Sequence, residues 1–263
     1  MDKSGRINSP PLAPPFSLPE NMTDSIRLAK RVTELRACSR REAELLITGG
    51  WVKVDGVVIE EPQFRVADQH IEIDARANPV QAEPVTLLLH KPAGYPMDAE
   101  TVSLLNPETL WVEDAPGAIA TSIHPLKAHF ARLTACAPLE TSAAGLVVFS
   151  QDWRIVRKLT EDAATVEHEI VVEVVAEVSE ESLKRLNRGI PFQGHLPTSI
   201  KVSRQNETRL RIALKGARPG QVQQICEAVG LPPLGMKRIR LGGVAMGKLP
   251  PGKWRYLRDG ERF

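Results

Sequence analysis

Two clusters of basic side chains are the residues of this sequence best suited to bind a charged ligand. Between Arg27 and Arg41 six basic residues accompany a single acid, and from Lys237 onward eight accompany two acids. The net charge of the chain is only +2, so the positive charge is concentrated in these clusters. Such clusters are typical of proteins that bind nucleic-acid phosphates. A solvated charged face without a ligand is the alternative interpretation of each cluster.

Metal and disulfide chemistry are not indicated by the sequence. Four of the six histidines are scattered, without a second ligand at helical or turn spacing: His90, His124, His129 and His168. Three cysteines are also far apart and form no CxxC pair: Cys38, Cys136 and Cys226. No stretch has the length of a membrane span, and the first residues lack the apolar core of a secretory signal. We therefore expect a cytoplasmic protein with no metal, no organic cofactor and no membrane contact.

Local signals predict the elements that present the first basic cluster. Apolar residues recur at helical spacing with Leu28, Val32 and Leu35, which predicts a helix with one buried face and one basic face. Ser39 and Glu42 form a capping box, so a second helix is expected to begin there. After this helix, alternating valines flank the pair Asp55-Gly56, which is typical of a tight hairpin turn.

Composition divides the chain into four segments. Residues 1–24 are rich in proline and small polar residues, so we expect a disordered tail. Residues 25–76 form the helix-helix-hairpin module, and residues 77–84 are an acidic, proline-containing linker. Residues 85–263 alternate predicted strands and helices, beginning with a buried strand at 85–89. The expected class is α+β, with a small module followed by a larger, mixed and mainly antiparallel sheet domain.

The larger domain shows seven further element signals. Strands are expected at 146–149, 170–178, near Ile200 and near Leu210, and helices after Asp152 and at 180–186. A third helix is expected around 222–229, where apolar residues at helical spacing give one buried face.

The segment CSRREAELLITGGWVKVDGVVIEEP, residues 38–62, resembles the S4-like RNA-binding module. In that module Ser-Arg-Arg opens the second helix and Val-Lys-Val-(Asp/Asn)-Gly forms the hairpin. The resemblance implies that helix N-terminal amides and guanidinium groups bind RNA phosphates, by shape and charge more than by sequence. The RNA-binding candidates of this module are Arg27, Lys30, Arg31, Arg36, Ser39, Arg40, Arg41 and Lys53.

The larger domain resembles the pseudouridine synthases of the RsuA and RluB, RluE, RluF group, which join such a module to a catalytic domain and modify ribosomal RNA. The likeness is carried by Leu89–Gly94, Pro138–Leu146, Gln221–Gly230, and Met236–Gly242 with Leu249–Arg255. The last segments add three candidates for RNA binding: Lys237, Arg238 and Arg240. The implied partner is structured RNA, expected to be ribosomal, bound by a monomeric protein.

The resemblance implies an aspartate that acts at the sugar or base, a basic partner for it, and a tyrosine that stacks on the base. Glu140 stands at the aspartate position, Gln223 at the basic position and Ile170 at the tyrosine position. A neutral amide cannot form a charge-assisted pair with a carboxylate, and isoleucine has no π-face. A one-residue gap in the alignment would bring Arg218 nearer the site.

These replacements favour an RNA-binding protein that is weak or inactive in uridine isomerisation. An active synthase that uses Glu140 as its catalytic carboxylate is the first alternative, since a glutamate can serve as base or nucleophile. A protein-interaction module without RNA affinity is the second. Glu140 itself could also be a surface residue in a polar loop.

Overall fold

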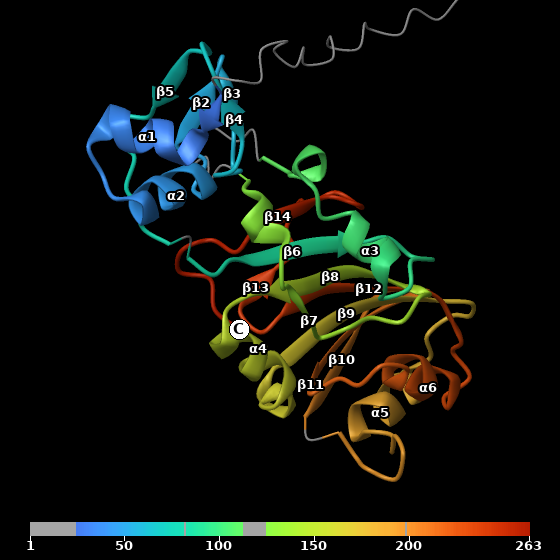
Figure 1. Cartoon of the computed structure of the whole chain (residues 1–263). Coiled ribbons are helices and arrows are strands. Elements are labelled where there is room, and N and C mark those ends of the chain that lie inside the picture. Colours follow the sequence, from blue (N-terminus) through green and yellow to red (C-terminus); the bar gives the residue numbers. More distant parts are fainter. Residues whose placement is uncertain (1–24, 82, 113–124, 198) are drawn as a thin grey trace, which may run out of the picture. The chain divides into compact units, whose positions relative to one another are not determined.

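The computed structural model describes residues 25–81, 83–112, 125–197 and 199–263 (Figure 1). The expected disordered tail, residues 1–24, and His124 lie outside the described residues. The chain divides into two compact units, the first ending at Gln81 and the second running from residue 82 to Phe263.

The first unit packs two helices against short strands. Its elements are β1 (Ile26–Arg27), α1 (Leu28–Arg36), α2 (Arg40–Thr48), β2 (Val52–Val54), β3 (Val57–Val58), β4 (Arg65–Val66) and β5 (Ile71–Ile73). β1 pairs with β4, and β2 lies between β3 and β5. The core includes fully buried Leu28, Val32, Leu46, Ile47 and Val52.

The local predictions for this unit are confirmed. The Ser39 hydroxyl accepts a hydrogen bond from the Glu42 amide, 3.3 Å, and the Glu42 carboxylate accepts one from the Ser39 amide, 2.8 Å. Asp55 and Gly56 both have positive φ, 50° and 80°, as a tight hairpin turn with a type I′ backbone requires. Leu35 is an exception, because it is 52% exposed: α1 ends one residue later and the chain turns away at the left-handed Ala37.

In the second unit the described residues form a mixed sheet of nine strands. Its main strand order is β10-β11-β9-β12-β8-β6-β14, with β13 paired to β12 and β7 to β8. Among the described strands β12 and β8 pair in parallel, and all other pairs are antiparallel, as expected. The strands are β6 (Thr86–Lys91), β7 (Thr134–Cys136), β8 (Ala143–Ser150), β9 (Glu167–Val174), β10 (Ile200–Asn206), β11 (Arg209–Lys215), β12 (Pro233–Leu241), β13 (Val244–Ala245) and β14 (Trp254–Tyr256).

The described residues of this unit also form helices and short 3-10 turns. They are α3 (Ala99–Ser103), α4 (Trp153–Thr160), α5 (Glu180–Arg188), α6 (Gln221–Glu227), η1 (Pro107–Thr109), η2 (Lys127–Phe130) and η3 (Ala163–Thr165). As expected, Asp152 precedes α4, and its carboxylate caps the helix by accepting from the Arg154 amide at 2.9 Å. The expected strand 170–178 instead ends at Val174, because the chain bends at residues 175–176 before α5 begins.

Side-chain alternation gives the central and outer strands different environments. In β6, Leu87 and Leu89 belong to one apolar cluster and Leu88 to another, so this strand is buried on both faces. In β11, by contrast, Leu210, Ile212 and Leu214 are buried, whereas the residues between them are partly or fully exposed. The buried residues of β11 share one cluster with α5 and α6, which lie beside each other at this end of the sheet (Figure 1).

Candidate functional site

A small pocket in the second unit collects side chains from four separate segments of the chain. Its lining includes Leu139, Glu140, His168, Ile170, Arg218 and Arg238. The cavity volume is about 20 Å³, which is space for a water molecule rather than a nucleobase. Two of the three positions singled out by the sequence, Glu140 and Ile170, therefore lie in the same pocket.

Glu140 is half-buried in the turn before β8. The backbone carbonyl of Glu140 accepts from the Ala143 amide, 3.1 Å, which fixes the turn that precedes the strand. Its side-chain carboxylate accepts a hydrogen bond from the amide of Gly220, the residue before α6, whose φ of 77° is left-handed. Glu140 is thus held at the pocket and is not a free surface glutamate.

Arg238 is the basic residue buried most deeply at this pocket. It is 2% exposed, and burial lowers the pKa of its guanidinium to about 9, while the charge of Glu140 acts in the opposite direction. Its Nε donates to the Leu146 carbonyl oxygen, 2.8 Å, and its Nη2 donates to the Ala137 carbonyl oxygen. These hydrogen bonds, rather than an ion pair, account for its position within the described structure.

A glycine makes this position of Arg238 possible. Gly145 on β8 lies opposite Arg238 in the parallel pair with β12. Its φ is +114°, a conformation that side chains rarely adopt, and a Cβ at Gly145 would overlap the backbone of Arg238. The close approach of β8 and β12 therefore depends on a residue without a side chain.

His168 is a neutral imidazole beside this guanidinium. It is 4% exposed, and burial, together with the charge of Arg238, lowers its pKa to about 3. Its Nδ1 lies 3.5 Å from Nη1 of Arg238, which favours the tautomer with the proton on Nε2. His168 can offer a hydrogen bond at neutral pH, but it carries no charge there.

Ile170 occupies the pocket wall on β9, next to Val222 and Met236. It is 7% exposed. No Phe, Tyr or Trp is among the described residues that line the pocket. The wall can therefore contact a base by dispersion but cannot provide a stacking ring.

The two other positions named from the sequence, Gln223 and Arg218, lie in different places. Gln223 is outside the pocket lining, and its side-chain amide donates to the Glu227 carboxylate at 2.9 Å on the exposed side of α6. Arg218 lines the pocket, as a gapped alignment would allow. Its backbone amide donates to the Gln221 side chain, 3.0 Å, which fixes the loop before α6.

Lys91 is a residue that sequence reasoning did not single out by itself. It is fully buried, and its ammonium group donates to the carbonyl oxygens of Tyr95, 2.6 Å, and Thr141, 3.4 Å. Desolvation lowers its pKa, and the charge of Glu140 acts against this. Because Thr141 follows Glu140, Lys91 ties the 92–95 turn to the loop that carries the carboxylate. Its position within the Lys-Pro-x-Gly segment was the available signal.

The RNA-binding candidates of the first unit are all exposed: Arg27, Lys30, Arg31, Arg36, Ser39, Arg40, Arg41 and Lys53. Some of them are partly engaged. Arg36 donates to the Ala77 carbonyl oxygen, 2.8 Å, and Arg40 pairs with Glu44 at 3.0 Å. Such exposed pairs are weak and leave the guanidinium accessible to other anions.

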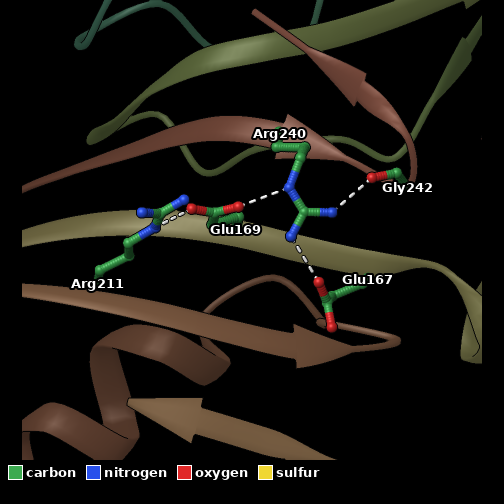
Figure 2. Close-up of polar contacts among 5 residues, drawn as sticks. All are labelled: Glu167, Glu169, Arg211, Arg240 and Gly242. Atoms are coloured by element: carbon green, nitrogen blue, oxygen red, sulfur yellow. Dashed lines mark hydrogen bonds and ion pairs between the residues drawn. The ribbon is translucent and has the colours of Figure 1, made fainter. Parts of the chain in front are cut away.

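The three RNA-binding candidates on β12 lie in different environments. Arg238 faces the pocket and is buried, while Lys237 is half-buried. Arg240 donates to Glu167 and to Glu169, both at 2.5 Å, and to the Gly242 carbonyl oxygen at 2.6 Å (Figure 2). Arg211 donates to the other oxygen of Glu169.

The described residues offer no metal site, and their buried thiols are unreactive. Within the described residues, no three His, Cys, Asp or Glu side chains gather to hold a metal ion. Burial raises the pKa of Cys136 to about 11 and of Cys226 to about 12, so both thiols stay protonated and act as small apolar groups. In the same part of the chain, no helix is both long and apolar enough to span a membrane.

Comparison with known proteins gives consistent matches. The S4 domain model matches residues 26–70. An uncharacterized RNA pseudouridine synthase of Aquifex aeolicus (strain VF5) is 26% identical over 240 residues, covering 90% of this chain and 94% of the relative. The dual-specificity RNA pseudouridine synthase RluF of Salmonella typhi is 26% identical over 243 residues, covering 91% and 78%. A crystal structure of a pseudouridylate synthase has the same fold, with a TM-score of 0.55, 19% identity and coverage of 90% and 97%.

Proposed function

Because this chain carries an S4 domain and is homologous to RNA pseudouridine synthases of the RluF type, we propose that it binds ribosomal RNA and isomerises uridine weakly or not at all. The set of residues that line the pocket is the observation that supports the proposal. The pocket keeps a carboxylate, Glu140, but Ile170 takes the place of a ring and Gln223 lies outside the lining.

Isomerising uridine requires breaking the carbon-nitrogen glycosidic bond, rotating the base and rejoining it through carbon. The nucleotide has to be extruded from its stack and held while this happens. Glutamate is one methylene longer than aspartate, and a misplacement of about 1 Å can cost on the order of a hundredfold in rate. The Glu140 carboxylate also accepts a hydrogen bond from the Gly220 amide, so one of its oxygens is already engaged within the protein.

The partners that would orient the base and the carboxylate are altered too. Gln223 cannot supply the charge-assisted pair, and it hydrogen-bonds to Glu227. Ile170 cannot stack on a base or donate a proton. A cavity of about 20 Å³ would have to open before a uracil could enter. Each change lowers transition-state stabilisation without affecting RNA docking by the S4 domain.

An active synthase is the second candidate, and one observation favours it. Two arginines, Arg218 and Arg238, are among the residues that line the pocket containing Glu140. The charge of Glu140 favours the protonated form of Arg238, so the two groups interact electrostatically. A modest shift of the Glu140 loop would let either arginine serve as the partner that Gln223 cannot be.

Mapping of pseudouridine separates the two candidates. Carbodiimide labelling and primer extension would be applied to ribosomal RNA from strains with and without the gene. We expect the same stops in both strains. A stop that disappears in the deletion strain, returns with the wild-type gene and is not restored by Glu140→Gln would establish the active synthase and overturn our proposal.

The salt dependence of RNA binding tests the docking part. If exposed cations of the S4 domain meet phosphates, the logarithm of affinity should fall steeply with the logarithm of salt concentration, by several units of slope. A flat response would instead favour a protein-interaction module without RNA affinity.

We further propose that residues 25–76 are the RNA-docking domain, residues 77–84 the linker and residues 85–263 the second domain. The division of the chain after Gln81 supports these limits. The three separated cysteines support a reducing, cytoplasmic location. A monomer is proposed as well, and light scattering of the purified chain would test it.

A further inference from the structure

Cross-strand pairing in the second unit gathers basic residues on one face of four neighbouring strands. Directly paired residues of adjacent strands point to the same face of a sheet. The register aligns Lys201, Ala213, Glu169 and Arg240 across β10, β11, β9 and β12. A second row, one pleat away, aligns Ser203, Arg211, Val171 and Lys237.

This face is opposite to the pocket wall. On β9, Glu169 and Val171 alternate with Ile170, and successive strand residues point to opposite faces. On β11 the alternate residues are apolar and pack with α5 and α6. The register adds Arg209 and Lys215 opposite Glu173 and Glu167. The basic sheet face is defined by six side chains: Lys201, Arg209, Arg211, Lys215, Lys237 and Arg240.

Three glutamates share this face: Glu167, Glu169 and Glu173. Of these, Glu169 lies beneath the cations. Arg211 and Arg240 hold the Glu169 carboxylate from two sides (Figure 2). The Glu169 side chain is 4% exposed, whereas those of Arg211 and Arg240 are 49% and 30% exposed. Burial raises the pKa of Glu169, but the two arginines outweigh this and lower it overall. The Glu169 carboxylate stays ionised, and above it solvent meets the guanidinium groups of Arg211 and Arg240.

Arg211 and Arg240 are oriented by the buried Glu169 carboxylate, which reduces the entropy lost when an anion binds. Lys201 and Lys215 are exposed and add mobile ammonium groups at the same face. Ala213 and Ser203, between the long side chains, are small enough to let a polyanion approach the strands.

We propose that the basic sheet face binds the phosphate backbone of structured RNA, as a contact distinct from the S4 domain and from the pocket. The charge pattern selects this occupant: six cations accompany three acids, all three of which are already paired with arginines. The proposal rests on RNA being the partner, but not on the S4 domain being its main anchor or on any activity of the pocket.

The test compares three double variants of the full chain with the wild type. Lys201→Gln/Lys215→Gln removes two cations of the face while sparing the arginines that hold Glu169. Lys184→Gln/Arg188→Gln is the matched control, because both residues are exposed on α5, on the other side of these strands. Arg40→Ala/Arg41→Ala reports on the S4 domain. Binding of a fluorescein-labelled RNA stem-loop is measured over a series of salt concentrations.

We expect the face variant to reduce the log-log salt slope by about two and to weaken binding on the order of tenfold or more at moderate salt, relative to the control variant. Equal slopes for the face variant and the control would overturn the inference. An unchanged affinity in the S4 variant would instead count against the proposed docking function, so the two failures can be told apart.

Discussion

The first unit and the pocket of the second unit hold their charged groups in opposite ways. The basic candidates of the first unit are exposed, and their ion pairs are surface pairs. In the pocket, Arg238 is 2% exposed and donates to backbone carbonyl oxygens, while Glu140 is bound by a backbone amide. Surface cations can exchange water for phosphate at little cost, whereas buried groups would have to leave partners they already have.

This difference in how charged groups are held makes polyanion binding and catalysis unequally sensitive to substitution. Binding of a polyanion tolerates many arrangements of exposed cations, since each contributes additively through released counterions. Catalysis depends on a few groups held within about an ångström of one geometry. Under the proposed function, Ile170 at the position of a ring and Gln223 at the position of a guanidinium would impair isomerisation and leave RNA docking unaffected.

The largest effect is expected from Gly145→Ala, which should destabilise the second unit by more than about 3 kcal/mol. The substitution would force a Cβ into the backbone of Arg238 at a φ of +114°. Urea unfolding measures the loss. Gly94→Ala is the control, because its φ of +91° is also strained but its Cβ would meet open space, so about 1 kcal/mol is expected. A similar loss for both glycines would show that the close approach of β8 and β12 is unimportant.

The next effect concerns pH. The folded pKa of His168 is about 3, below its usual 6.5, so between these values the unfolded chain binds a proton that the folded chain does not. The contribution of His168 to the free energy of unfolding should be fully present above pH 6.5. Below that pH it should fall by up to about 1.4 kcal/mol per pH unit. Urea unfolding between neutral and acid pH measures this slope.

His168→Gln should flatten that slope, and the exposed His70→Gln should not. If both variants kept the slope of the wild type, His168 would not be the group that titrates.

RNA affinity should respond to the first unit and not to the pocket carboxylate. Arg40→Ala/Arg41→Ala should weaken binding on the order of tenfold or more at moderate salt and lower the salt slope by about two. Glu140→Ala should leave affinity almost unchanged, because its carboxylate is bound within the protein. Fluorescence anisotropy with ribosomal RNA fragments checks both. A large loss with Glu140→Ala would reverse the contrast between the two regions.

The smallest effect is expected from Ser39→Ala, which removes the cap of α2 and should cost about 1 kcal/mol of stability. The hydrogen bond from Ser39 also lowers the pKa of Glu42, so its loss should bring that pKa back toward the ordinary range. Ser203→Ala, at an exposed strand position, is the control and should be close to neutral. Thermal unfolding followed by circular dichroism compares the two.

The amino-acid sequence by itself determined the features that depend on neighbouring residues. The capping box of Ser39 and Glu42, the Asp55-Gly56 turn and the Asp152 cap each involve residues at most three apart, so residue type and spacing suffice. The gathering of Glu140 and Ile170 at one pocket followed from the resemblance to a family rather than from any local rule.

Only the tertiary structure decided how the basic residues of β12 are used. In a regular strand Arg238 and Arg240 would share a face, because side chains alternate with a period of two. The register shifts between them, so Arg238 pairs with Ile170 at the pocket and Arg240 pairs with Glu169 on the opposite face. Such a bulge is fixed by long-range pairing with β9 and β8. No local pattern in Lys-Arg-Ile-Arg reveals it, because one inserted residue reverses the direction of every side chain that follows.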